Sequence, residues 1–192
     1  MTTLLARFWL FLWRWTTVPP QEPVPTHCVM IAAPHTTNWD FPITLAMARV
    51  SGVRINWLGK DALFRGPAGP IMKRLGGVPI DRSAPGGMVA SLAAEFAKRD
   101  HLVLVVPAEG TRSKTEHWKS GFYRIAELSD VPIVCAFVDR PSRSGGFGPV
   151  IQPTGDLTAD MDQVRAFYAG KEGLRSGRFG PVRLKEESAT PT

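Results

Sequence analysis

The stretch "HLVLVVP" (residues 101–107) decides the fold, because it is an unbroken run of leucine and valine between a histidine and a proline. A strand with one face in water alternates apolar and polar residues, whereas a continuous apolar run is typical of a strand covered on both faces. The stretch "HCVMIAAP" (residues 27–34) has the same character. The two stretches therefore predict central strands of a sheet that is covered on both sides.

Short apolar runs alternate with helical patterns along the rest of the chain. Further strands are predicted at residues 53–59, 78–80, 131–139 and 150–152, and helices at residues 40–50, 70–77, 86–100, 120–128 and 159–169. The stretch "RPSRSGGFGP" (residues 140–149) is typical of a hairpin. Because strands alternate with helices, residues 26–170 are predicted to form one α/β domain, an αβ-sandwich around a mostly parallel or mixed sheet.

The N-terminal residues 1–18 are strongly apolar but contain Arg7 and Arg14. The segment is shorter than the roughly 20 residues that span a bilayer. On a helical wheel, one arc holds Leu4, Leu5, Phe8, Phe11, Leu12 and Trp15, opposite the two arginines. This pattern predicts an amphipathic helix lying in the interface of a membrane, on its cytoplasmic face, although a helix packed on the protein's own core remains an alternative. A proline-rich linker follows at residues 19–25, and residues 171–192 are predicted to be a polar, partly disordered tail with little to bury.

The charge balance is basic, with 23 Lys and Arg residues against 17 Asp and Glu residues. Such a surface favours an anionic partner, which includes a membrane surface, a phosphorylated substrate and nucleic acid. No nucleic-acid motif, P-loop or dinucleotide fingerprint accompanies the charge, so no nucleic-acid partner is expected. The four histidines lack metal-ligand spacing, so no metal is expected. Cys28 and Cys135 lie in apolar runs and are expected to be buried and reduced.

Polar clusters follow three of the predicted strands, where sites of α/β sheets gather. His35 follows residues 27–34, Arg82 follows residues 78–80, and the stretch "EGTR" (residues 109–112) follows residues 101–107. Arg112 can bind a phosphate with two parallel hydrogen bonds, and Arg82 and Lys60 can add to the same anion site. A solvated basic residue is the alternative for each of them.

His35 and Asp40 lie five positions apart in "HTTNWD" (residues 35–40). With His35 in a turn and Asp40 in the first turn of a helix, the carboxylate can accept the Nδ1–H of the ring and leave Nε2 as a general base. No Gly-x-Ser-x-Gly motif is present and neither cysteine lies in a turn, so the activated hydroxyl is predicted to belong to a substrate. Taken alone, the pair is explained better by a helix cap at Asp40 or Asn38 with a surface histidine.

Four short blocks in order resemble those of one enzyme family. They are "HTTNWD" (35–40), "GGVPIDR" (76–82), "EGTR" (109–112) and "VPIV" (131–134). Together they resemble the sequence blocks of the glycerophospholipid acyltransferases, the lysophosphatidate acyltransferase family, over roughly residues 27–140. The resemblance implies an αβ-sandwich enzyme without a cofactor. It would transfer an acyl chain from an acyl-CoA or acyl-carrier-protein thioester to a lysophospholipid hydroxyl, in phospholipid biosynthesis or remodelling.

The resemblance also implies a role for each matching residue. His35 would be the base and Asp40 its orienting partner. The phosphate site of the acceptor would be contacted or shaped by Arg82, Glu109, Gly110, Thr111 and Arg112. Pro132 would be structural or line the acyl site. Two other functions remain open from the sequence: a peripheral lipid-binding protein without catalysis, and an acyl-thioester hydrolase.

Overall fold

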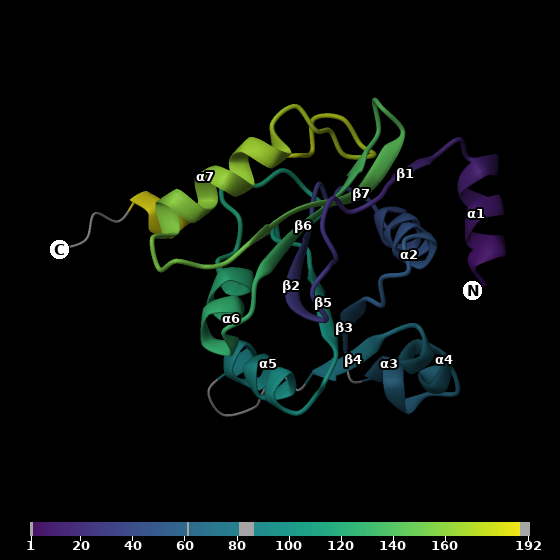
Figure 1. The fold of residues 1–192 in the computed structure, drawn as a ribbon, viewed down its shortest axis with the longest axis horizontal. Coiled ribbons are helices and arrows are strands. Elements are labelled where there is room, and N and C mark those ends of the chain that lie inside the picture. The colour runs from purple at the N-terminus through teal and green to yellow at the C-terminus, as the bar shows by residue number, and fades with distance from the viewer. Residues whose placement is uncertain (1, 61, 81–86, 189–192) are drawn as a thin grey trace.

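A seven-stranded sheet forms the centre of the computed structural model (Figure 1), in the order β1-β7-β6-β2-β5-β3-β4. The structure describes residues 2–60, 62–80 and 87–188. The strands are β1 (Thr16–Val18), β2 (His27–Ala32), β3 (Asn56–Lys60), β4 (Gly77–Ile80), β5 (Leu102–Val106), β6 (Ile133–Asp139) and β7 (Ser144–Ile151). The helices are α1 (Thr3–Leu12), α2 (Asp40–Val50), α3 (Ala62–Arg65), α4 (Gly69–Arg74), α5 (Gly87–Ala97), α6 (Gly121–Ser129), α7 (Leu157–Tyr168) and a 3-10 turn, η1 (Lys185–Ser188).

The two apolar runs lie side by side at the centre of the sheet, as predicted. β2 pairs in parallel with β5 on one side and with β6 on the other. The hairpin pair β6–β7 is antiparallel, and the other strand pairs are parallel. Cys28 and Cys135 are buried, free thiols, and burial raises the pKa of each to about 12. The prediction of an αβ-sandwich around a mostly parallel sheet is confirmed.

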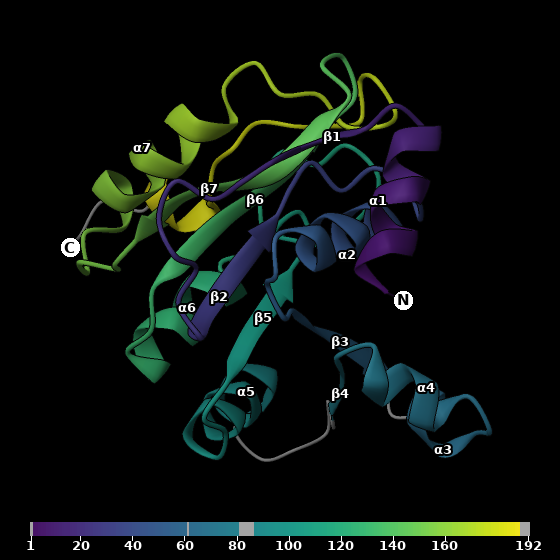
Figure 2. The ribbon, with the colours of Figure 1, turned by 45° about the vertical axis from the view of Figure 1, so that its right-hand side comes forward.

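Side chains of β2 alternate between two hydrophobic clusters, one on each face of the sheet. Val29 and Ile31 pack with residues of α5, α6 and α7, whereas Cys28 and Met30 pack with residues of α2. In Figures 1 and 2 these helices cover opposite faces of the sheet, and α1 lies beside α2. This arrangement leaves the loops after β2 and β5, which carry the candidate site residues, at the same edge of the sheet.

The N-terminal segment differs from the predicted helix over residues 1–18. The helix ends at Leu12, because Trp13 leaves the helical conformation and Arg14 has a positive φ of 57°. The next residues, Thr16–Val18, are β-branched and form β1, which pairs in parallel with β7. The core alternative describes Ala6 and Leu10, which are buried, whereas most of the large side chains of α1 are exposed and the interface alternative stays a prediction.

The C-terminal segment contradicts the expectation that it has little to bury. After α7 the chain returns to the body of the protein, where Leu184 is fully buried and forms a β-bridge with Trp118. Phe179 and Val182 pack against the same cluster. Apolar residues spaced widely among charged ones gave no strand or helix pattern here, so their burial was missed.

Candidate active site

The loop after β2 brings His35 and Asp40 together. Asp40 is the first residue of α2, and its Oδ2 lies 3.3 Å from Nδ1 of His35. The same Oδ2 accepts hydrogen bonds from the backbone N–H groups of Thr36 and Thr37, at 2.6 and 2.7 Å, and Oδ1 accepts one from the Thr37 hydroxyl at 3.0 Å. These bonds come from residues before the helix, which argues against a simple helix cap. The predicted approach of the two side chains is therefore present, and their catalytic role stays a prediction.

Burial makes the histidine–aspartate pair rigid. Only 4% of Asp40 is exposed, so its negative charge is compensated by the donors around it rather than by water. The neighbouring Thr36 is buried, and its hydroxyl accepts a hydrogen bond from the backbone N–H of Arg175. The C-terminal segment thus closes over the loop from outside, and holds it against the carboxyl edge of the sheet.

The buried side chain of Glu109 holds the backbone of His35 and does not face solvent. Its Oε1 accepts the backbone N–H of His35 at 2.7 Å, and the residue is 3% exposed. Burial raises the pKa of Glu109 to about 7. Oε2 is buried and has no hydrogen-bond partner among the described residues. This position agrees with the pocket-shaping role that the resemblance implies, and it does not suit a direct contact with a substrate phosphate.

The rest of the stretch "EGTR" turns outward. Gly110 has a φ of +65°, a conformation that favours glycine, and the chain then runs into solvent. The hydroxyl of Thr111 accepts the N–H of Ser113, which makes a local turn. Arg112 is exposed and lines the pocket beside His35. An exposed guanidinium at this edge is suited to hold a phosphate.

Of the three remaining predicted residues, the structure describes one in full. Arg82 lies outside the described residues, and Lys60 is the last residue of β3, described in its backbone alone. Pro132 precedes β6, and its carbonyl accepts the N–H of Val29 at 3.0 Å. That places Pro132 at the end of β6 opposite the pocket, so it is structural and does not line the acyl site.

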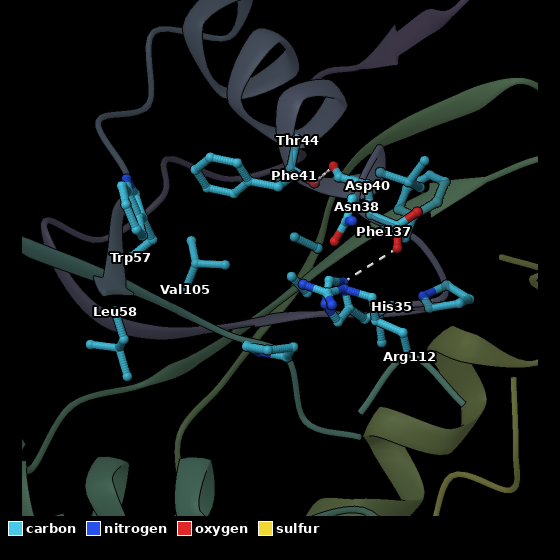
Figure 3. A pocket seen from close by; sticks show the side chains of 16 residues that line it. His35, Asn38, Asp40, Phe41, Thr44, Trp57, Leu58, Val105, Arg112 and Phe137 are labelled. Atoms are coloured by element: carbon cyan, nitrogen blue, oxygen red, sulfur yellow. Dashed lines mark hydrogen bonds and ion pairs between the residues drawn. The ribbon is translucent and has the colours of Figure 1, made fainter. Parts of the chain in front are cut away.

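A pocket of about 380 Å³ opens beside His35 (Figure 3). Four polar side chains gather at one end, namely His35, Asn38, Asp40 and Arg112, and Thr44 of α2 also lines the pocket. Apolar side chains at the other end come from α2, β3 and β5 and include Phe41, Trp57, Leu58 and Val105. The ring centroids of Phe41 and Trp57 are 5.2 Å apart, edge to face. The pocket therefore joins a histidine and an arginine to an apolar surface.

Sequence reasoning missed the apolar wall of this pocket. Trp57 was assigned only to a strand and Phe41 only to a helix, because a single aromatic residue in either pattern is usually core. A signal was nevertheless present. Phe41 directly follows the histidine–aspartate motif, which marks the edge of the sheet where sites gather.

Within residues 2–60, 62–80 and 87–188, no three or more His, Cys, Asp or Glu side chains are grouped so that they can hold a metal ion. In the same part of the chain, no helix has the length and apolar character needed to cross a membrane.

Comparison with known proteins gives matches of three kinds. The sequence model of the family described as Acyltransferase matches residues 16–139. A 1-acyl-sn-glycerol-3-phosphate acyltransferase of Bacillus subtilis is 27% identical over 114 residues, which are 59% of this chain and 56% of that protein. The chain thus spans about half the length of this curated relative.

The third kind of match is a solved structure. The crystal structure of the 1-acyl-sn-glycerophosphate acyltransferase PlsC from Thermotoga maritima superposes with a TM-score of 0.60 at 15% identity, covering 91% of this chain and 78% of that one. It supports the fold. The match to the family model covers more than half of the chain and includes His35, Asp40 and the stretch "EGTR", and on this ground the chain belongs to the acyltransferase family.

Proposed function

We propose that this protein transfers a fatty acyl chain from an acyl-CoA or acyl-carrier-protein thioester to the hydroxyl of a lysophospholipid, such as 1-acyl-glycerol-3-phosphate. The observation that carries the proposal is the 3.3 Å approach of Asp40 to His35 at the polar end of an apolar pocket. Membership of the acyltransferase family and the names of the two matched enzymes support it.

His35 acts as the general base in this proposal. Asp40 accepts the Nδ1–H of the ring, which fixes the tautomer and leaves Nε2 to take the proton of the acceptor hydroxyl. The resulting oxygen attacks the carbonyl carbon of the thioester. The tetrahedral intermediate then collapses, the C–S bond breaks, and the thiolate leaves and takes up a proton. The products are the acylated lipid and the free thiol.

Arg112 positions the acceptor. Its exposed guanidinium lines the same pocket as His35, so a phosphate bound there places the neighbouring glycerol hydroxyl close to the ring. Holding the two reactants together in this way removes much of the entropic barrier of a bimolecular step. Arg82 is proposed as a second phosphate contact on the strength of its sequence block alone.

The apolar end of the pocket is proposed to hold the start of an acyl chain. Phe41, Trp57 and Val105 offer it a surface without charge, next to the base. Burying each methylene of the chain there releases about 0.8 kcal/mol. The thioester carbonyl would then lie at the boundary between the two ends of the pocket.

Helix α1 is proposed to dock the protein on a membrane surface, where both lipids are found. Its apolar side chains are exposed to an unusual degree, with Leu4 at 78%, Phe11 at 77% and Phe8 at 63%. Arg7 is exposed on the same helix and suits anionic headgroups. Deletion of residues 1–12 is expected to reduce sedimentation with anionic vesicles, and unchanged sedimentation would contradict docking through α1.

One assay tests the reaction and separates it from its rivals. Purified protein is incubated with an acyl-CoA or acyl-carrier protein and lysophosphatidate, and both thiol release and lipid product are followed. Transfer gives equal amounts of the two, whereas thiol without lipid product identifies a hydrolase. Vesicle binding with neither product identifies a lipid-binding protein without catalysis. His35→Ala is the matched inactive variant.

A further inference from the structure

The helices α3 and α4 carry exposed apolar side chains that the site does not use. Leu63 is 48% exposed and Ile71 is 59% exposed, although both lie in short helices that could have turned these side chains inward. The same segment is basic, because residues 62–80 contain Arg65, Lys73 and Arg74 and no acidic residue. Apolar and cationic side chains without acidic ones are the composition of an element that contacts an anionic lipid surface.

Contacts on the inner side fix the orientation of this unit. The ring of Phe64 packs on Trp57, with centroids 6.1 Å apart. The indole N–H of Trp57 donates to the carbonyl of Leu75 at 2.9 Å, which ties the end of α4 to β3. With Phe64 and the end of α4 held against β3, the side chains of Leu63 and Ile71 are left exposed to solvent. Trp57 joins this unit directly to the wall of the pocket.

The α3–α4 unit lies at the same end of the molecule as α1. In Figures 1 and 2 both are on the right-hand side, with α1 and its neighbour α2 above α3–α4. The pocket is lined from this side by Phe41 of α2 and Trp57 of β3. A flat surface placed against this end would meet both α1 and α3–α4.

We propose that α3 and α4 form a second contact with an anionic bilayer, so that the protein rests on the membrane at two places that flank the pocket. The inference deepens the proposed function, on which it rests for the membrane as the location of the substrates. A bilayer is favoured over a protein partner because α4 carries Lys73 and Arg74 beside the exposed Ile71, and because the patch shares its end of the molecule with the exposed side chains of α1. Lipid substrate would then enter between the two contacts.

A fluorescent label reports the contact directly. Single cysteines replace Leu63, Ile71, Leu4 or Leu128 and are labelled with an environment-sensitive dye. The native thiols are buried with raised pKa values, so they do not compete for the label. Leu128 on α6 is the matched control, because it is 62% exposed and lies away from α1 and α3–α4.

The probe is a vesicle of phosphatidylcholine with about a quarter phosphatidylglycerol. Labels at positions 63 and 71 are expected to shift to shorter wavelength on vesicle addition and to be quenched by spin-labelled lipids, as the label at position 4 is, whereas that at position 128 stays in water. If labels 63 and 71 stay in water, whether or not label 4 responds, the proposal is overturned. A protein partner would be indicated by their response to lysate but not to vesicles, and this too overturns it.

Substitutions give a second measurement. Leu63→Ser with Ile71→Ser is expected to weaken vesicle binding about tenfold, whereas Leu128→Ser leaves it unchanged. Lys73→Gln with Arg74→Gln is expected to weaken binding to anionic vesicles about fivefold for each cation and to have little effect on neutral vesicles. Arg124→Gln on α6 is the matched control for charge. Equal loss in the α6 controls would contradict the proposal.

The outcome is separable from the acyl transfer reaction. Short-chain, water-soluble acyl-CoA and lysolipid can be assayed without vesicles, where the α3–α4 variants are expected to keep wild-type turnover. If neither the wild type nor the α3–α4 variants form lipid product in this assay, the proposed function is contradicted and the labelling result is unaffected. Normal turnover, together with labels at positions 63 and 71 whose spectra do not shift on vesicle addition, contradicts only the second contact.

Discussion

The two loops that meet at the pocket differ in how firmly the protein holds them. The loop after β2 is fixed by hydrogen bonds to the Asp40 carboxylate, by Glu109 from below and by Arg175 from outside. The loop after β5 is fixed at its start by Glu109 and by the carbonyl of Ala108, which accepts the N–H of Lys119, whereas from Gly110 to Lys114 it is exposed. The group proposed to move a proton is thus preorganised, whereas the group proposed to bind a phosphate is left free to adjust to it. Each prediction below tests one side of this difference.

The largest effect is expected from the rigid loop. His35→Ala removes the proposed base, and acyl transfer is expected to fall by about 10³-fold or more. The loss should appear in kcat, because the ring is not proposed to hold the ground state of either substrate. Initial rates of lipid product measure it, with circular dichroism as the check on folding. Transfer at more than a tenth of the wild-type rate would remove His35 from the mechanism.

A smaller loss is expected from Asp40→Asn, at about 10²-fold in kcat. The amide keeps one oxygen to accept the N–H groups of Thr36 and Thr37, but it cannot accept and stabilise charge as the carboxylate does. Asn38→Ala is the matched control in the same loop, since it changes a pocket residue with no part in the proton transfer. The pH dependence of kcat separates the roles. A variant that lost only loop structure would keep the wild-type profile at a lower rate.

Substitutions in the exposed loop after β5 are expected to change substrate binding rather than kcat. Arg112→Lys keeps the charge but loses the paired hydrogen bonds, and KM for the lysophospholipid is expected to rise about tenfold with kcat nearly unchanged. Lys114→Gln, two residues along the same exposed loop, is the matched control and should leave KM within about twofold. A fall in kcat with unchanged KM would show that Arg112 takes part in the chemical step and that the contrast between the loops is mistaken.

The sequence predicted the central part of the molecule better than its two ends. The buried strands 27–34 and 101–107 were clear because continuous apolar runs have few alternative structures, and the helix predicted at 40–50 has the observed bounds of α2. The N-terminal helix was drawn too long because Trp13–Trp15 continue an apolar pattern, and only the backbone at Arg14 breaks it. Leu184 was missed because its burial depends on Trp118, which is distant in sequence.

The sequence motifs of the site could be predicted, whereas the residues that hold the motifs in place could not. Asp40 and His35 are close in sequence, so their approach could be derived from turn geometry alone. The bond from Glu109 to the backbone of His35 joins residues 74 positions apart, and no local pattern announces it. The same holds for the apolar wall at Trp57, which depends on the neighbouring strand.

Glu109→Gln should have the smallest effect on turnover and tests the point at which both loops join. The amide oxygen of Gln can still accept the N–H of His35, so kcat is expected to stay within a few-fold of wild type. The free energy of unfolding should change more clearly, and in a pH-dependent way. Burial raises the pKa of Glu109 from 4.5 to about 7, so the folded state holds its proton more tightly than the unfolded state.

The sign of this dependence follows from the bound proton. Between pH 4.5 and about 7 the unfolded carboxyl is ionised while the folded one is still protonated, so wild-type stability falls as the pH rises, by on the order of 3 kcal/mol in total. Above about pH 7 both are ionised and the loss is complete. Glutamine does not titrate, so urea unfolding from about pH 5 to about pH 8 should show the variant gaining on wild type up to about pH 7 and running parallel above it. If the unfolding free energies of wild type and variant ran parallel over the whole pH range, the Glu109 carboxylate would have a hydrogen-bond donor for Oε2. The loop after β5 would then be held as firmly as the loop after β2.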